Sequence, residues 1–331
     1  MGNINFMVQI FTLQKTTIMT PPLVSVIIPN YNHAPYLDER IRSIVEQSFQ
    51  DFEIILLDDC STDQSISILN KWAKHPKISH FIVNKQNSGS TFLQWEKGFS
   101  LAKGKYIWIA ESDDVAHPDF LNITVNYLNQ FPDASLCFTG SFLIDASGNI
   151  DSRNWDIWTK SEATKNFSYI ENKHFITHQL LWFNAIYNAS AVLFRRSALS
   201  EIDNTYKQLH YCGDWYFWSE LIRKGHVIIV YNKLNYFRQH NIKVSPKAEA
   251  NGLQFKEGFI VIEHISKSFH LSAFIQNAAK GALYRKIKKY NKFSTPDIKN
   301  KLLEEFNQRY KTRPIFLRIC YRIQKLISKH K

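Results

Sequence analysis

The first third of the chain alternates between apolar runs that favour β-strands and amphipathic segments that favour helices. Four apolar runs lie at residues 23–29, 52–57, 78–83 and 106–110. Because these runs are nearly continuous, each strand is expected to be covered on both faces, as the strands of parallel sheets are. The repeated alternation predicts an α/β fold with a mostly parallel, doubly wound sheet and flanking helices.

The segments between these runs carry helix signals. Leu37, Ile41 and Ile44 are spaced to form one apolar stripe of a helix. Ser61 and Gln64 have the spacing of a capping box, which predicts that the next helix begins there.

Polar residues directly follow three of the predicted strands. They are residues 29–32 (Pro-Asn-Tyr-Asn), the pair Asp58 and Asp59, and residues 111–114 (Glu-Ser-Asp-Asp). Ligands of doubly wound sheets bind outside the carboxyl ends of the strands, so these groups are expected to converge at one edge. Crowded carboxylates there need a cation or ligand donors. Hard oxygen ligands suit Mg²⁺ or Mn²⁺, completed by substrate phosphates. Taken alone, each group also fits a solvated loop.

Composition limits the class of protein. The 331 residues are 44% hydrophobic and 21% charged, as in a globular protein. No run approaches the ~18–20 apolar residues of a membrane span, and the first 20 residues lack the pattern of a secretory signal. The four cysteines are scattered without metal-type pairing, which favours reduced thiols and a cytoplasmic location.

The net charge of +12 belongs to the C-terminal tail. Residues 280–331 contain 16 Lys and Arg against 3 Asp and Glu, a balance of +13, which leaves −1 for the rest. Within residues 312–331, apolar residues line one helical face and basic residues another, which is typical of a helix on an anionic membrane surface. A helix that packs its apolar face on its own domain is the alternative.

The second half of the chain has a mixed pattern. Short strands are predicted at 135–139, 141–145, 188–194 and 226–231, and a helix at 214–224. From about residue 250 the chain is predicted to be mostly helical. Residues 1–21 are expected to form an extension outside the fold; the alternative is that the biological start is Met19.

These motifs together resemble the family 2 glycosyltransferases, which have the GT-A fold. The matching segments are residues 24–32, 53–63, 87–89, 102–114, 213–214 and 236–240. The resemblance spans residues 22–245 and implies a glycosyltransferase domain with a nucleotide-binding half at 22–130 and an acceptor half at 131–245. Residues 246–331 are then a basic, mostly helical extension.

The resemblance implies roles for the residues at the strand ends. Pro29, Tyr31, Asn32 and Asn87 are expected to line the nucleotide pocket. Asp59 is expected to accept a hydrogen bond from the base, since a carboxylate pairs well with the N–H of uracil or thymine. UDP- or dTDP-sugars are therefore the favoured donors. Asp58 either contributes there, or only braces the loop or caps the following helix.

The family's Asp-x-Asp motif appears here as Glu111-Ser112-Asp113. Asp113 is expected to bind Mn²⁺ or Mg²⁺, Glu111 to contact the ribose or a metal-bound water, and Asp114 to brace the loop. His240 is the candidate further ligand, and His33 is treated as incidental.

Asp214 is the predicted general base of an inverting transfer to a hydroxyl of a glycan or lipid-linked acceptor. The family usually has a Glu-Asp pair at this position, and this chain has Gly213-Asp214. An N-cap role for Asp214 is the alternative. The pathway implied is synthesis of a surface polysaccharide, in the cytoplasm or at the inner face of the membrane.

Other classes of protein fit the sequence less well. A dehydrogenase needs a Gly-x-Gly-x-x-Gly turn after the first strand, and a sugar nucleotidyltransferase needs a Gly-rich basic loop there; neither is present. A non-catalytic glycan-binding relative is a further alternative. No nucleic-acid motif accompanies the basic tail, which argues against a nucleic-acid partner.

Overall fold

The computed structural model describes residues 21–240 and 248–327. Nearly all of the predicted N-terminal extension therefore lies outside the described residues. The chain divides into two compact units. The first contains the described residues up to Tyr169, with Asn188–Ile202 and Gly225–Gln239. The second contains Ile170–Tyr187, Asp203–Lys224 and the described residues from His240 onward.

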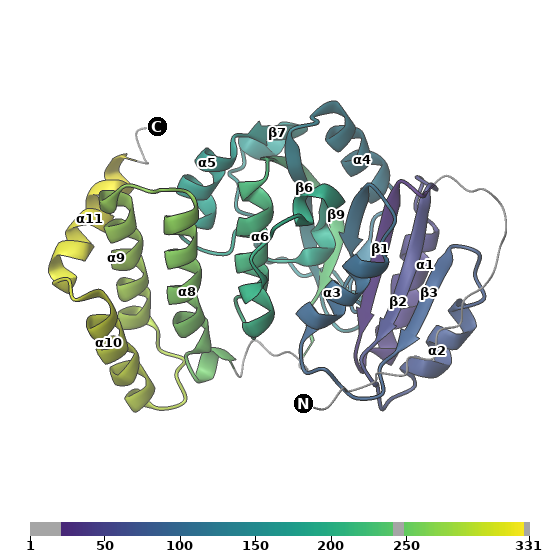
Figure 1. The fold of residues 1–331 in the computed structure, drawn as a ribbon, viewed down its shortest axis with the longest axis horizontal. Coiled ribbons are helices and arrows are strands. Elements are labelled where there is room, and N and C mark those ends of the chain that lie inside the picture. The colour runs from purple at the N-terminus through teal and green to yellow at the C-terminus, as the bar shows by residue number, and fades with distance from the viewer. Residues whose placement is uncertain (1–20, 241–247, 328–331) are drawn as a thin grey trace. The chain divides into compact units, whose positions relative to one another are not determined.

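The first unit is built on one sheet, as the alternation of the sequence predicts (Figure 1). Its strands follow the order β3-β2-β1-β4-β8-β6-β9-β5, with β7 beside β9. They are β1 (Val24–Asn30), β2 (Phe52–Asp58), β3 (Ile78–Val83), β4 (Tyr106–Ile109), β5 (Val115–Ala116), β6 (Ala134–Ile144), β7 (Phe167–Ile170), β8 (Val192–Arg195) and β9 (His226–Arg238). Strands β1 to β4 pair in parallel, whereas β8 runs antiparallel to β4 and β6. The α/β class and the mostly parallel sheet are confirmed.

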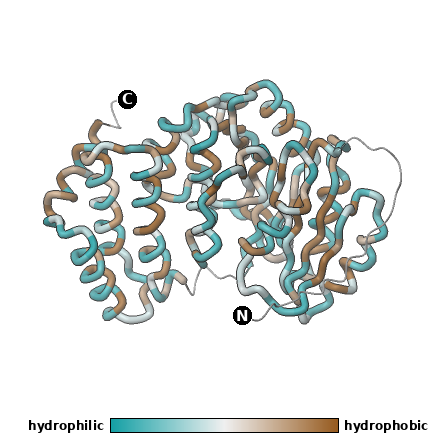
Figure 2. The backbone as a smooth tube through the Cα atoms, in the orientation of Figure 1, coloured by the Kyte–Doolittle hydropathy of each residue, from teal (hydrophilic) through white to brown (hydrophobic). Residues whose placement is uncertain are grey.

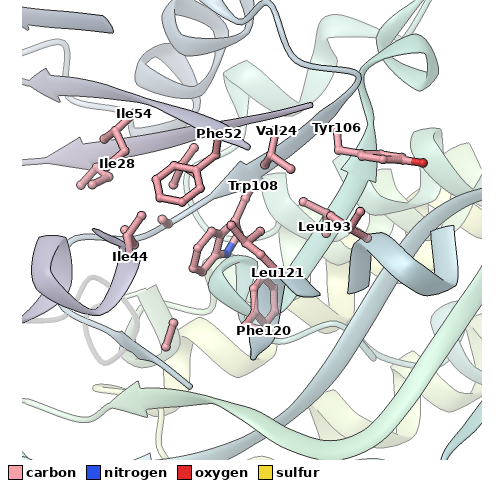
Figure 3. Packing of buried hydrophobic residues seen from close by; sticks show 14 of the residues in the cluster. Val24, Ile28, Ile44, Phe52, Ile54, Tyr106, Trp108, Phe120, Leu121 and Leu193 are labelled. Atoms are coloured by element: carbon pink, nitrogen blue, oxygen red, sulfur yellow. The ribbon is translucent and has the colours of Figure 1, made fainter. Parts of the chain in front are cut away.

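Helices of the first unit cover the sheet. They are α1 (Ala34–Val45), α2 (Ser65–Trp72), α3 (Thr91–Leu101) and α4 (Phe120–Gln130), with short 3₁₀ turns at Glu162–Thr164, Ala189–Ala191 and Arg196–Leu199. Every residue of β1 and β2 is buried, which explains their continuous apolar sequences (Figure 2). Trp108 of β4 stacks on Phe120 of α4, with ring centroids 4.5 Å apart, and both belong to the core in Figure 3.

Three local predictions are wrong. Helix α2 begins at Ser65 rather than at Ser61. The Ser61 hydroxyl instead donates to Asp58, at 2.7 Å, and accepts from the backbone N–H of Asn32. The two strands predicted at 135–139 and 141–145 are one strand, β6. The strand predicted at 188–194 begins only at Val192, after a 3₁₀ turn.

The second unit is helical. It contains α5 (Asn172–Phe175), a π-helical turn at Ile176–Leu180, a 3₁₀ helix at Asn204–Gln208, α6 (Gly213–Arg223), α8 (Leu253–Ser268), α9 (Ala273–Lys289), α10 (Pro296–Tyr310) and α11 (Pro314–Ile327). The predicted C-terminal helical extension is thus present. Among the helices described, none is both long and apolar enough to cross a membrane.

Helices α9 and α11 approach each other closely because α9 has a glycine at the contact. A Cβ atom built on Gly281 would lie 2.1 Å from the carbonyl oxygen of Leu317. Gly258 of α8 has ordinary space, since its nearest neighbours would be 3.9 Å away.

These two glycines give a matched test of the packing between α9 and α11. Gly281→Ala is expected to lower the free energy of unfolding by about 2 kcal/mol or more, because backbone atoms must move apart. Gly258→Ala is expected to be neutral or to raise it by up to about 1 kcal/mol, through helix propensity. Urea unfolding measures both, and equal effects would contradict the close contact.

Candidate active site

The loops after β1 and β2 are tied together at the carboxyl edge of the sheet. The Asp58 carboxylate accepts hydrogen bonds from the Asn30 side chain (2.7 Å) and from the backbone and hydroxyl of Ser61 (2.8 and 2.7 Å). These contacts are all with protein groups that hold the loop, which is the bracing role considered for Asp58.

Asp59 is buried and surrounded by donors. Its carboxylate accepts from the backbone and hydroxyl of Ser88, from the Asn84 amide at 2.6 Å and from the Gln94 amide at 2.9 Å. The side chain of Asn87 donates to the Asp59 carbonyl oxygen at 3.1 Å. The structure therefore brings Asp59 and Asn87 together, and the contact of Asp59 with a base stays a prediction.

The turn after β1 places three predicted residues differently. Pro29 is buried within β1, opposite Leu57. Asn32 adopts a positive φ of 55°, and its side chain accepts from the backbone of Thr62 at 2.8 Å. The side chain of Tyr31 is 45% exposed, so its ring is available to a ligand.

The three carboxylates after β4 lie in different surroundings. Glu111 accepts a hydrogen bond from the Trp95 indole at 3.0 Å, and burial together with the charge of Asp113 raises its pKa to about 8. Asp114 is almost fully buried and accepts from the Asn188 amide and the Arg238 backbone, each at 2.9 Å. Burial and the charge of Asp113 raise the pKa of Asp114 to about 6. Asp114 thus has partners that suit a bracing role.

Two arginines hold this loop, and Arg40 is the one whose charge compensates the carboxylates. Arg40 of α1 is fully buried, with its guanidinium 5.0 Å from the centre of the Trp108 ring. Among the described residues its guanidinium has no hydrogen-bond partner, so its interaction with Asp114, Asp113 and Glu111 is Coulombic. Desolvation lowers the pKa of Arg40 to about 10.

Arg238 of β9 fixes the loop backbone directly. Its guanidinium donates to the Asp113 carbonyl oxygen at 2.7 Å and to the Glu39 carboxylate at 2.6 Å. Arg238 belongs to the 236–240 motif, which was the available signal for it.

A set of possible metal ligands lies beside this loop. His33, Asp113 and His240 each offer one ligand atom, and these atoms lie within 4.8 Å of one another. His240 directly follows Gln239 in the chain. The backbone N–H of Gln239 donates to the backbone carbonyl oxygen of Ile144 in β6, at 2.7 Å. One carboxylate and two imidazoles suit Mn²⁺ better than Mg²⁺, which prefers oxygen ligands. His33, treated as incidental from the sequence, is therefore part of the candidate site.

In the second unit, Asp214 lies in the first turn of α6. The helix begins at Gly213 and its N-cap residue is Cys212, so the alternative that Asp214 is the N-cap is wrong. Its carboxylate accepts from the Asn184 amide and from the backbone of Trp215, each at 2.7 Å. Burial raises the pKa of Asp214 to about 6, against the effect of these two hydrogen bonds.

Asp214 lines a cavity of about 230 Å³ within the second unit. Aromatic side chains and four polar side chains surround it: Trp182, Phe183, Tyr211, Trp215 and Phe255, with Asp214, Asn184, Gln254 and Lys286. Within the part of the chain that the structure describes, two buried oxygens, Asn184 Oδ1 and Gln254 Oε1, have no hydrogen-bond partner. Three residues thus offer oxygen acceptors, which suits a ligand with several hydroxyl groups.

The loop before α6 is held by one carboxylate. Glu257 of α8 accepts hydrogen bonds from the backbone N–H groups of His210, Tyr211 and Cys212, at 2.8, 2.8 and 2.7 Å. These donors would otherwise be unpaired ahead of the helix. Glu257 therefore fixes the start of α6 and, with it, the backbone of Asp214.

Residues 25–203 match the model of Glycosyl transferase family 2, and the chain belongs to this family. It is 32% identical over 232 residues to an uncharacterized glycosyltransferase of Haemophilus influenzae, covering 68% of each chain. It is 33% identical over 127 residues to the putative teichuronic acid biosynthesis glycosyltransferase TuaG of Bacillus subtilis, covering 38% of this chain and 50% of TuaG.

Solved structures show the same fold at lower identity. The S. aureus protein TarS, residues 1–349 with UDP-GlcNAc, gives a TM-score of 0.61 at 17% identity, covering 86% of this chain and 80% of that one. The mannosyltransferase PcManGT from Pyrobaculum calidifontis, with GDP-Man and Mn²⁺, gives 0.52 at 18% identity, covering 93% and 86%. The protein is thus a glycosyltransferase with the GT-A fold.

The raised pKa of Asp214 makes a prediction about stability. The folded protein binds this proton more tightly than the unfolded chain does, so the contribution is complete below about pH 4 and is lost as pH rises through about 6. We compare the melting temperature of the wild type with that of Asp214→Asn. The stability advantage of the wild type should become smaller from pH 4 to pH 7, by at most about 3 kcal/mol.

Differential scanning fluorimetry in half-unit pH steps measures this difference. Asp51→Asn, which removes an exposed carboxylate at the start of β2, is the control and should show no such fall. A wild-type minus Asp214→Asn difference that stays flat or rises would contradict the raised pKa of Asp214.

Proposed function

We propose that this protein transfers a sugar, with inversion, from a nucleoside-diphosphate donor to a hydroxyl of a glycan or lipid-linked acceptor during surface polysaccharide synthesis. The observation that carries this proposal is the half-buried carboxylate of Asp214, which lines a cavity with several oxygen acceptors in the second unit. Relatives named for teichuronic acid biosynthesis and for chondroitin synthesis support the pathway.

The donor is proposed to bind at the carboxyl edge of β1, β2 and β4. The exposed ring of Tyr31 offers a stacking surface to the base, beside Asn32 and Asp59. Asp59 favours a UDP- or dTDP-sugar, since its carboxylate accepts from a ring N–H. Glu111 is proposed to contact the ribose.

Asp113, His33 and His240 are the residues that would hold Mn²⁺ or Mg²⁺. A bound divalent ion stabilises the negative charge that develops on the departing diphosphate. Arg238 contributes from the protein side, because its hydrogen bond to the Asp113 carbonyl oxygen fixes the loop that presents this carboxylate.

Asp214 is proposed to take the proton of the acceptor hydroxyl. As the bond from the acceptor oxygen to the sugar C1 forms, the bond from C1 to the diphosphate oxygen breaks, and the nucleoside diphosphate leaves. A pKa of about 6 leaves the carboxylate mostly ionised at neutral pH and still basic enough to accept the proton. Asn184 and Gln254 are proposed to accept hydrogen bonds from other hydroxyls of the acceptor.

The four cysteines are free thiols, and three of them, Cys137, Cys212 and Cys320, are buried. Free buried thiols are typical of a reducing compartment, so we infer that the reaction takes place in the cytoplasm.

A donor panel tests the first part of the proposal. UDP-, dTDP- and GDP-sugars are added with and without Mn²⁺, and the melting temperature is measured. We expect one uridine or thymidine donor to stabilise the wild type by several degrees only when Mn²⁺ is present. Asp113→Asn should lose most of this stabilisation, whereas Asp51→Asn, at the opposite end of the strands, should keep it.

Stabilisation by the same donor in Asp113→Asn would contradict the metal site. Stabilisation of the wild type without turnover of the donor would favour the non-catalytic relative.

Asn184 tests the role of Asp214. Its hydrogen bond lowers the pKa of the Asp214 carboxyl, so Asn184→Ala should shift the acid limb of the pH–rate profile upward by about one unit. Release of nucleoside diphosphate from the donor found above is the measurement. Gln254→Ala, which also lines the cavity but makes no bond to Asp214, should slow the reaction without moving this limb. Unshifted limbs in both variants would remove Asp214 as the titrating base.

A further inference from the structure

Helix α11 packs on its own unit through one narrow face. Leu317 and Cys320 are buried, and the backbone of Leu317 lies against Gly281 of α9. Figure 1 shows α11, in yellow, beside α9. The alternative that the tail helix packs on its own domain is thus realised, but only by this face.

A second apolar face of α11 is exposed. Six large side chains, each 43% to 68% exposed, form it: Ile315, Phe316, Ile319, Ile323, Leu326 and Ile327. At 100° per residue they cover an arc of about 120° that continues from the buried face. Among the described residues, no other helix leaves so many large apolar side chains in contact with solvent.

Basic residues border the other side of this exposed arc. Arg318, Arg322 and Lys325 are exposed, and α11 contains no acidic residue. Within the described part of the chain, none of the three forms a salt bridge. Arg285 of α9 lies over the ring of Tyr321, 5.8 Å from its centre, and adds a fourth positive charge near this edge.

We propose that this exposed face of α11 binds the surface of an anionic lipid bilayer. The apolar arc would enter the boundary between headgroups and acyl chains, and the basic row would contact the acidic headgroups. The 14 residues of α11 are too few to span a bilayer, so the helix lies along the surface. A symmetric pairing with a second copy would bring two basic rows near each other, which disfavours that occupant.

The location of α11 gives this contact a consequence for the reaction. Helix α9, on which α11 packs, also lines the Asp214 cavity with Ala279, Ala282, Leu283 and Lys286. A membrane-bound α11 is therefore one helix away from the cavity, where a lipid-linked acceptor could enter from the bilayer. This step rests on the proposed function, whereas the membrane contact itself does not.

Vesicle co-sedimentation of the full chain tests the contact. Vesicles of phosphatidylcholine alone are compared with vesicles containing one-third phosphatidylglycerol. We expect binding to the anionic vesicles to be at least about tenfold tighter, and to weaken as salt is raised. The pair Ile319→Gln and Ile323→Gln should reduce binding about tenfold or more without changing the net charge. Ile150→Gln, at an exposed site of the first unit, is the control and should bind as the wild type does.

The charge contribution has its own matched pair. Arg318→Gln with Arg322→Gln should lower binding to anionic vesicles, whereas Lys71→Gln with Lys74→Gln, in the last turn of α2 and just after it, removes the same charge and should have little effect. All the substituted side chains are exposed or lie on loops, so the melting temperature should stay within a few degrees of the wild type.

Equal binding to both kinds of vesicle, no binding to either, or no loss in the α11 variants would overturn the proposal. If the isoleucine variants instead dissociate a dimer seen by light scattering, a second copy is the occupant. Donor-dependent thermal stabilisation is measured on the same variants, so that failure of the membrane contact is distinguished from failure of the proposed function.

Discussion

The first unit depends on how three carboxylates are kept together at the end of a buried strand. Glu111, Asp113 and Asp114 repel one another, and burial removes much of the water that would stabilise their charges. The positive charge of Arg40 partly compensates these negative charges, although its guanidinium makes no hydrogen bond among the described residues. Arg40 therefore occupies a buried position of α1, where a helix normally has an apolar residue. The raised pKa values of Glu111 and Asp114 show that one guanidinium does not compensate them fully. Under the proposed function, a divalent cation would add further positive charge at this loop.

In the second unit one carboxylate, Asp214, lines a cavity that has both aromatic and polar walls. The family match ends at residue 203, whereas Asp214 and most of the residues around it come later in the chain. The C-terminal helices α8 and α9 form part of the wall of this cavity. If this cavity binds the acceptor, as proposed above, most of the residues that contact the acceptor are encoded after the matched region.

The first four strands could be predicted because they are nearly continuous apolar runs that alternate with helix signals. The polar groups at the strand ends could also be recognised from the sequence, because Asp58, Asp59 and residues 111–114 directly follow apolar runs. Arg40 could not be found in this way, because a buried arginine has the same sequence signature as an exposed one, and Arg238 was signalled only by the 236–240 motif. The cavity could not be predicted either, since its walls come from segments as distant as Leu181 and Lys286. The capping box at Ser61 failed because the hydroxyl serves the Asp58 loop instead.

Glu257 accepts hydrogen bonds from three successive backbone N–H groups. This has a consequence for how the enzyme could be truncated or recombined with its relatives. Helix α8, from the C-terminal region, supplies the hydrogen-bond acceptor that the start of α6 lacks in its own sequence. A fragment that ended with the family motifs would keep Asp214 in its covalent structure and lose the group that orders its backbone. When segments are exchanged between relatives, α6 and α8 should therefore be transferred together.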